Sequence, residues 1–206
     1  MYRCIKSDEI DIFKEPARLI IGGSSGSGKS FFISKLIRKY RRKFSRVIVI
    51  GSNLQNCTDL NIERNDTFDP FLDEISGNIL IIYDDILLNK NLLAKAAEVF
   101  LRGRHFNFSV CLLTQNVFHN CKFYRTIALN CTHNILLRMR DIKQINCFGQ
   151  TFLTKSEVEK FVTLYKRIVI REKYRYILID FTTFVEDPLC FRSNICDESY
   201  EQAFLL

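Results

Sequence analysis

Nine residues near the start of the chain constrain its fold more than any other feature. The segment GGSSGSGKS, residues 22–30, contains four of the eight glycines of the chain. From Gly23 to Ser30 it fits the pattern G-x-x-x-x-G-K-[ST] at every fixed position. An apolar run of strand length, 17–21, precedes it, and a helical pattern, 29–43, follows it. A strand, a glycine-rich turn and a helix in this order predict a phosphate-binding loop.

The composition of this loop follows from the chemistry of phosphate binding. Backbone N–H groups must approach the phosphate oxygens closely, and side chains would obstruct that approach. The next helix adds unpaired N–H groups and the positive end of its dipole. We expect Lys29 to reach the β- and γ-phosphates of a nucleotide and the Ser30 hydroxyl to bind Mg²⁺. The residues expected to bind the nucleotide are Gly23, Ser24, Ser25, Gly26, Ser27, Gly28, Lys29, Ser30 and Phe31.

Apolar runs alternate with helical patterns along the rest of the chain. The runs are rich in Ile, Val and Leu without strict alternation, which is typical of buried parallel strands. Helical patterns at 91–102 and 157–170 lie between some of them. The expected strands are 17–21, 47–50, 78–83, 109–113, 134–137 and 174–181. The sequence therefore predicts an α/β fold with a wound, mostly parallel sheet.

The length of 206 residues indicates a single domain, which we assign to residues 1–182. Residues 183–206 carry five acidic residues against Arg192 alone, and we expect an acidic tail or a strap between subunits. Residues 52–77 are polar and irregular, and the pattern assigns them no element. No apolar run approaches the roughly 20 residues of a transmembrane helix, so we expect no membrane partner.

The eight cysteines form no CxxC pair, and we expect reduced thiols rather than a disulfide framework. His119, Cys121, Cys131 and His133 can be written as a zinc set, but their spacing is unusual for small zinc modules. The 18 Phe and 8 Tyr residues lie mostly at core positions of the predicted elements, and we identify no base-stacking platform among them.

The net charge of +7 is unevenly distributed. Residues 35–46 carry seven Lys and Arg residues and no acid. Such a cluster suits a polyanion, and it is also typical of a solvated helix face. Because this helix runs away from the glycine loop, we expect its basic end on an outer face rather than a catalytic one.

Two acids follow the apolar run 79–83. Asp84 and Asp85 stand at the carboxyl end of a predicted buried strand, which faces the crevice where α/β sheets bind ligands. We expect Asp84 to hold Mg²⁺ through water and Asp85 to orient or deprotonate an attacking water. Many hydrolases with this loop carry Glu at the second position, and Asp is one methylene shorter. The alternative is a turn with two solvated aspartates.

The run 109–113 ends in Thr114-Gln115-Asn116. A polar residue here can touch the γ-phosphate or its water, and Gln115 is the first candidate, with Asn116 second. The alternative is a turn or helix cap formed by Thr114 or Asn116.

Two arginines stand just before the same run. Arginine stabilises charge on a transferring phosphoryl group, often across a subunit boundary, and Arg104 is our first candidate and Arg102 our second. The alternative is a helix end at which Arg is favoured by the dipole.

Taken together, four segments resemble the viral genome-packaging ATPases of the poxvirus type, in the FtsK/HerA superfamily of DNA-pumping motors. They are GGSSGSGKS, ILIIYDD, LRGRHFNFSVCLLTQN and RTIALNCTHNILLRMRD, and the resemblance covers roughly residues 17–180. Similar proteins occur in large DNA viruses, virophages and Polinton or Maverick transposons. The resemblance implies a P-loop NTPase of the additional-strand type, a three-layer fold in which the Gln115 strand separates the glycine-loop strand from the Asp84 strand.

The resemblance also implies a mechanism. ATP would be hydrolysed with Mg²⁺ bound at Ser30 and Asp84, while Asp85 activates water and Gln115 senses the γ-phosphate. Arg104 would act on the site of a neighbouring subunit. A homo-oligomeric ring, a hexamer or pentamer, would pump double-stranded DNA into a capsid, with capsid or portal proteins as partners. It would work inside the host cell where virions assemble, in cytoplasm or nucleus, and association with the virion is a further implication.

Two alternatives belong to other classes. A small-molecule P-loop kinase acting on nucleosides or nucleotides would need an Arg-bearing lid, whereas Asp84, Asp85 and Gln115 favour water as the nucleophile. A non-hydrolysing, nucleotide-gated assembly factor would not require the complete set of Lys29, Ser30 and the two aspartates.

Overall fold

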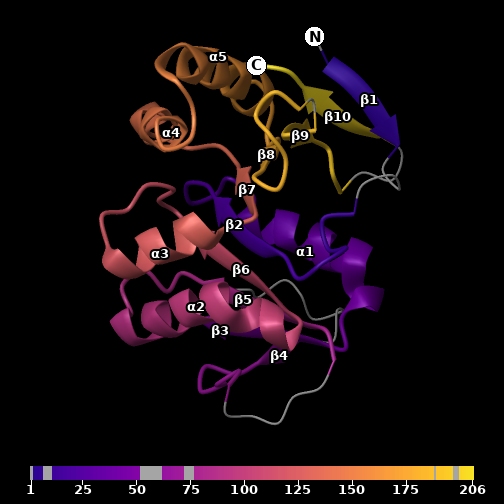
Figure 1. Cartoon of the computed structure of the whole chain (residues 1–206), viewed down its shortest axis with the longest axis vertical. Helices are drawn as coiled ribbons and strands as arrows, with labels where there is room; N and C mark the ends of the chain where they lie inside the picture. The colour runs from indigo at the N-terminus through magenta and orange to yellow at the C-terminus, as the bar shows by residue number, and fades with distance from the viewer. Residues whose placement is uncertain (1, 7–10, 52–61, 72–76, 188, 197–199) are drawn as a thin grey trace.

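The structure, a computed structural model, describes residues 2–6, 11–51, 62–71, 77–187, 189–196 and 200–206. Within these residues one sheet of ten strands has the order β1-β10-β9-β8-β7-β2-β6-β5-β3-β4 (Figure 1). Its parallel part is made of β7 (His133–Leu136), β2 (Arg18–Gly22), β6 (Phe108–Thr114), β5 (Ile79–Asp84), β3 (Arg46–Gly51) and β4 (Glu63–Arg64). The antiparallel part is made of β8 (Ile177–Asp180), β9 (Phe191–Ser193), β10 (Tyr200–Phe204) and β1 (Tyr2–Lys6).

The order of the central strands fixes where a ligand can bind. β6 lies between β2 and β5, as the resemblance implies. Gly22 pairs with Thr114, and Asp84 pairs with Leu113, so the three strands end in register. The loops that follow them therefore emerge together at the carboxyl edge of the sheet.

Helices cover both faces of the sheet and make a three-layer fold. α1 (Lys29–Tyr40) packs on one face, and α2 (Lys90–Arg102) and α3 (Lys122–Asn130) pack on the other. On β2, Leu19 and Ile21 join the α1 core, whereas Ile20 joins the core of α2 and α3. Both faces of the strand are buried, which explains its continuous apolar sequence. α4 (Ile142–Gly149) and α5 (Lys155–Tyr165) cover the antiparallel part, at the top of Figure 1.

Five of the six predicted strands are found close to their expected bounds, and the sixth is shorter. β8 begins at Ile177 rather than at 174, because Tyr174 has a left-handed backbone with φ 65° and cannot continue a strand. The helix predicted at 157–170 begins at Lys155 and ends in a π-helical turn, η4 (Lys166–Ile170). α3 and α4 were not predicted. Of the unassigned region 52–77, residues 52–61 and 72–76 lie outside the described residues.

The segment 183–206, expected as an acidic tail, instead contributes β9 and β10 to the sheet. Phe191 and Phe204 are buried in the same core as α5, and burial of these apolar side chains holds the segment in place. Arg192, its lone basic residue, is fully buried rather than solvated. Acidic residues 197 and 198 lie outside the described residues.

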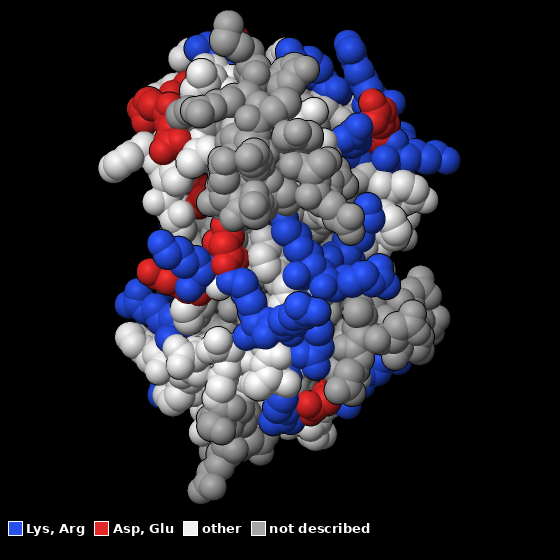
Figure 2. Space-filling model, turned by 90° about the vertical axis from the view of Figure 1, so that its right-hand side faces the viewer, with Lys and Arg blue, Asp and Glu red and all other residues white. Residues whose placement is uncertain are grey.

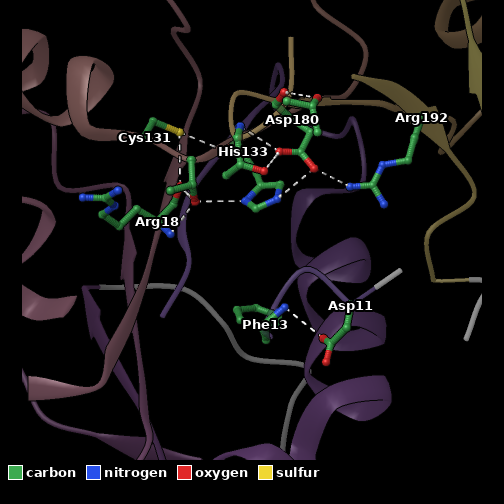
Figure 3. A network of polar contacts seen from close by, with 10 residues as sticks. Asp11, Phe13, Arg18, Cys131, His133, Asp180 and Arg192 are labelled. Carbon is green, nitrogen blue, oxygen red and sulfur yellow. Dashed lines mark hydrogen bonds and ion pairs between the residues drawn. The ribbon is translucent and has the colours of Figure 1, made fainter. Parts of the chain in front are cut away.

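A buried polar network ties the antiparallel part to the parallel part (Figure 3). Arg192 on β9 donates to Asp180 on β8, with Nη2 and Oδ2 2.9 Å apart. His133 on β7 has its Nε2 3.5 Å from the same oxygen, and Thr182 donates to the other one. Burial alone would raise the pKa of Asp180, but His133 and Thr182 together hold it far below the usual value. The carboxylate is therefore ionised and joins three strands.

The cysteine and histidine pairs do not form a metal site in the described residues, where no group of three possible ligands is found. Cys131 donates its thiol to the carbonyl oxygen of His133, and burial raises the pKa of that thiol to about 12. Six cysteines form no disulfide: Cys111, Cys121, Cys131, Cys147, Cys190 and Cys196. No helix in those ranges is both long and apolar enough to span a bilayer.

Candidate active site

A cavity of about 360 Å³ lies at the carboxyl edge, where β2, β5 and β6 end. It brings together groups that are far apart in the sequence. The glycine loop with Lys29 and Ser30 forms one wall, Asp84 and Asp85 line a second part, and Gln115 a third. These are the predicted site residues that follow the three central strands.

The glycine loop adopts a conformation that its sequence makes accessible. Gly26 and Gly28 have φ values of 75° and 99°, in the left-handed region that glycine tolerates. Backbone bonds hold the loop, because Ser24 N donates to the Arg138 carbonyl at 3.0 Å and Ser27 N donates to the Ser24 carbonyl at 3.0 Å. The first turn of α1 carries no acidic residue, and no side chain caps it. Its N–H groups therefore point toward the cavity and suit an anion.

Lys29 lies back over the loop. Its Nζ donates to the Gly23 carbonyl at 2.5 Å and to the Ser24 carbonyl at 3.3 Å. Burial lowers the pKa of Lys29 from its usual value, while the negative charges of Asp84 and Asp85 oppose that shift. Ser27 Oγ is buried beside the loop and has no hydrogen-bond partner among the described residues. A half-buried ammonium and an unsatisfied hydroxyl both fit a bound phosphate chain.

The two aspartates occupy different environments although they are adjacent. Asp84 ends β5 and is buried, with 8% of its surface exposed. Asp85 is exposed and turns out of the strand with φ 55°. Gly51 on β3 lies against the Asp84 backbone, where a Cβ would come within 2.1 Å of the Asp84 carbonyl oxygen. The neighbouring strand thus supports the turn that separates the two carboxylates.

The structure separates the two candidates that follow β6. Asn116 is used within the fold, because its Oδ1 accepts from Gln144 Nε2 at 3.2 Å and its N donates to Thr114 Oγ1 at 3.1 Å. Gln115 is exposed and lines the cavity. The turn predicted as the alternative is therefore present, and it leaves Gln115 facing the site.

Arg102 and Arg104 do not reach this cavity. Arg104 lies in η3 (Gly103–Phe106), which precedes β6 and so stands at the amino edge of the sheet. The seven residues of β6 separate it from Gln115 by roughly 20 Å. Arg102 bonds to Glu98 one turn earlier and lies over the Phe71 ring. Neither arginine can act on phosphates bound by its own chain.

Sequence reasoning missed three contributors to the site. The Arg138 carbonyl and the Arg140 N–H bond to Ser24, at 3.0 Å and 2.8 Å, and so fix the entry to the loop. Both residues follow the end of β7, and this position could have predicted that they lie at the site. Tyr174 lines the cavity from the segment before β8, and nothing in its local sequence indicated this.

A glycine loop before a helix, two acids at the end of a buried strand, and a glutamine strand between them define a P-loop nucleotide-binding fold. Residues 61–203, more than half of the sequence, match the family described as Poxvirus A32 protein, and the chain belongs to this family of DNA-packaging ATPases. The glycine loop precedes the matched span. No curated protein matches the chain.

Solved structures with the same fold come from archaeal viruses and bacteria. The DNA-packaging ATPase B204 of Sulfolobus turreted icosahedral virus is 15% identical, with a TM-score of 0.55 over 93% of this chain and 98% of B204. The genome packaging NTPase B204 of Sulfolobus turreted icosahedral virus 2, in complex with ATP-gammaS, is 15% identical, with a TM-score of 0.54 over 81% of this chain and 93% of that one. The cytoplasmic domain of the Thermomonospora curvata type VII secretion ATPase EccC is 11% identical, with a TM-score of 0.58 over 93% of this chain and 25% of that one. At these identities the likeness concerns the fold.

Proposed function

We propose that the chain is a subunit of a homo-oligomeric motor that couples hydrolysis of Mg²⁺-bound ATP to movement of double-stranded DNA into a capsid. The observation that carries this proposal is the single cavity shared by the glycine loop, Lys29, the two aspartates and Gln115. The structurally similar B204 protein was solved in complex with ATP-gammaS, which supports a nucleotide as the ligand of this chain.

Each residue of the cavity has its own role in this proposal. The loop amides and Lys29 bind the phosphates. When they do, the hydrogen bonds of Lys29 Nζ to the Gly23 and Ser24 carbonyls are replaced by bonds to phosphate oxygens. Ser30 and Asp84 supply the oxygen ligands that Mg²⁺ prefers, directly and through water. When bound, Mg²⁺ neutralises charge on the phosphates. Asp85 orients the attacking water, and its exposed position lets that water enter from solvent.

Arg104 acts on a neighbouring subunit. It is exposed at the amino edge of the sheet, whereas the nucleotide binds at the carboxyl edge. A ring of copies in head-to-tail contact brings one edge against the other. The arginine then stabilises charge on the phosphoryl group bound next door, so that hydrolysis requires assembly.

DNA binding would be directed mostly at phosphates. Lys and Arg side chains gather across the middle of the face shown in Figure 2, the side on which α1 lies in Figure 1. From α1 through η1 (Arg41–Lys43), the exposed members are Arg38, Arg42 and Lys43. Together with the net charge of +7, this face supports a contact that tolerates any sequence and weakens with salt. Capsid or portal proteins are the proposed partners, where virions assemble in the host cell.

The test measures ATP hydrolysis with and without long duplex DNA across a salt series. Lys29→Ala removes the phosphate contact, and Asp85→Asn removes a charge while keeping a residue that tolerates the left-handed turn. We expect the wild type to turn over, DNA to accelerate it, salt to abolish that acceleration, and both variants to be inactive. Glu159→Gln, an exposed charge change on α5, is the matched control and should behave as wild type.

Two results would contradict the proposal. ATP binding without turnover, with or without DNA, would remove support for the roles of Asp85 and Arg104. Transfer of phosphate to a nucleoside in place of water would assign the chain to the small-molecule kinases.

A further inference from the structure

A second cavity, of about 240 Å³, adjoins the phosphate cavity. The two share Phe31 and Tyr174, which line both of them. Asp84, Asp85 and Gln115 line only the first cavity. The second cavity therefore opens from the aromatic rim of the phosphate site and not from its catalytic groups.

The two aromatic side chains that form this rim are exposed. Phe31 is 54% exposed and Tyr174 57% exposed, whereas most large apolar side chains of the described residues are in the core. Their ring centroids are 5.6 Å apart with an interplanar angle of 47°. The Phe31 ring is also 5.1 Å from Lys35 Nζ, one turn further along α1. Exposed aromatic surface beside a charged cavity indicates a binding surface rather than packing.

Tyr174 is held in a backbone conformation that its residue type disfavours. Its backbone φ of 65° is unusual for a bulky residue. Its ring lies over Gly28, where an added Cβ would come within 2.5 Å of a ring carbon. Strained backbone is retained mainly where the surroundings fix it, and such residues cluster at ligand sites. The position thus sets an aromatic ring directly beside the phosphate-binding loop.

The direction of a bound nucleotide follows from the placement of the catalytic groups. A nucleotide whose reacting phosphate lay with Asp84, Asp85 and Gln115 would run its phosphate chain along the loop toward the start of α1. Its nucleoside would then leave the loop on the side of Phe31, where the second cavity opens. Its wall also holds polar groups, since Arg175 Nη1 donates to Asn194 Oδ1 at 2.6 Å.

We propose that Tyr174 and Phe31 form the stacking wall for the base of the nucleotide, with the second cavity as the base pocket. The inference rests on the proposed function, because it concerns the same nucleotide. It assigns a binding role to the segment before β8, which the sequence had indicated to be a strand.

The experiment compares the binding of ATP with that of inorganic tripolyphosphate, which has the phosphate chain and no base. Tyr174→Ala should weaken ATP binding on the order of tenfold, as expected for the loss of one base–aromatic contact, and leave tripolyphosphate binding unchanged. Tyr174→Phe keeps the ring and should bind ATP as wild type does. Phe31→Ala should give the same split between the ligands, so the result does not depend on one variant folding.

Phe184→Ala is the control, because this side chain is 83% exposed and lines neither cavity. An equal loss of both ligands in Tyr174→Ala would overturn the inference and assign the ring to shaping the loop. Unchanged ATP binding in both variants would also overturn it. A wild type that binds neither ligand would refute the phosphate site and the proposed function, whereas one that binds both ligands equally would refute the base pocket alone.

Discussion

Neighbouring residues at this site are given different tasks by the backbone that carries them. Asp84 continues a strand and is buried, while Asp85 turns into solvent. Gln115 and Asn116 divide in the same way, because Asn116 is hydrogen-bonded to Gln144 and Gln115 lines the cavity. At the scale of single residues, the turn decides which side chain bonds within the fold and which one is left to face the site.

Gln115→Ala tests this division against Asn116→Ala. Because Gln115 lines the cavity at the proposed position of the γ-phosphate, we expect its loss to lower kcat on the order of 10²-fold, the usual scale for a group that assists proton transfer or orients water. ATP affinity should remain near that of the wild type. Asn116→Ala should instead lower the free energy of unfolding by about 1 kcal/mol, because the side-chain hydrogen bond from Gln144 is lost. Wild-type turnover by Gln115→Ala would contradict the assignment.

Asp180→Asn tests the buried network of Figure 3. Arg192 is fully buried, so removing the charge of its partner should lower the free energy of unfolding by about 3–5 kcal/mol. The control is Glu98→Gln, which breaks the exposed pair with Arg102 and should cost at most about 1 kcal/mol. Urea unfolding at neutral pH compares the two, and equal effects would contradict the buried pair as a stabilising contact.

The same carboxylate predicts a dependence on pH. The pKa of Asp180 in the folded protein is far below its usual value, near 4 in an unfolded chain. The unfolded state therefore binds the proton first, and the stabilisation is complete above about pH 4 and declines below it. Between pH 5 and pH 3 the wild type should lose more stability than Asp180→Asn. Parallel losses in urea midpoint would show that another group controls the acid sensitivity.

At the scale of elements, the sequence predicts those strands, helices and loops that have a residue pattern of their own. The glycine loop, the buried parallel strands and three helices carry their own patterns of apolar residues and turn residues. α3 buries only Tyr124 and Ile127 of its nine residues, so its periodicity is too weak to indicate a helix. β9 has three residues and is specified by pairing with β8 and β10, which no local pattern encodes. Tyr174 likewise reaches the site through contacts between segments that are far apart in the sequence, so no local pattern predicts its position.

Gly28→Ala tests the junction between the loop and α1. The backbone φ of 99° and the overlying Tyr174 ring both exclude a Cβ, so we expect a loss of at least about 1 kcal/mol in stability and a much weaker affinity for ATP. Gly77→Ala is matched to it, because Gly77 has φ 102° and precedes β5 at the opposite edge of the sheet. It should lose similar stability and keep its affinity for ATP. Equal ATP binding by both variants would argue against a special requirement at Gly28.

At the scale of the whole molecule, the two edges of the sheet carry different halves of the proposed reaction. The nucleotide cavity is at the carboxyl edge and Arg104 at the amino edge. A subunit by itself is then incomplete, although its own fold is continuous from one edge to the other.

Mixing two inactive variants tests this division. Lys29→Ala lacks a working nucleotide site and keeps Arg104, while Arg104→Ala has the reverse defect. Each variant should be inactive alone. In an equal mixture, roughly a quarter of the interfaces pair an intact Arg104 with an intact nucleotide site, and these interfaces should regain activity. Lys29→Ala mixed with the double variant is the control and should stay inactive. Full activity of Arg104→Ala alone would contradict a role in trans.

The pairing of β1 with β10 has a consequence for how the chain is made. Tyr2 lies opposite Phe204 in the sheet, so the two partners are separated by nearly the whole sequence. During synthesis residues 2–6 find no partner until residues 200–204 have followed them out of the ribosome. The closure of so long a loop is slow, and β10 has an unpaired edge until it is complete. The nascent protein therefore passes through a stage in which the open edge of β10 can pair with another chain, and docking of β1 ends that stage.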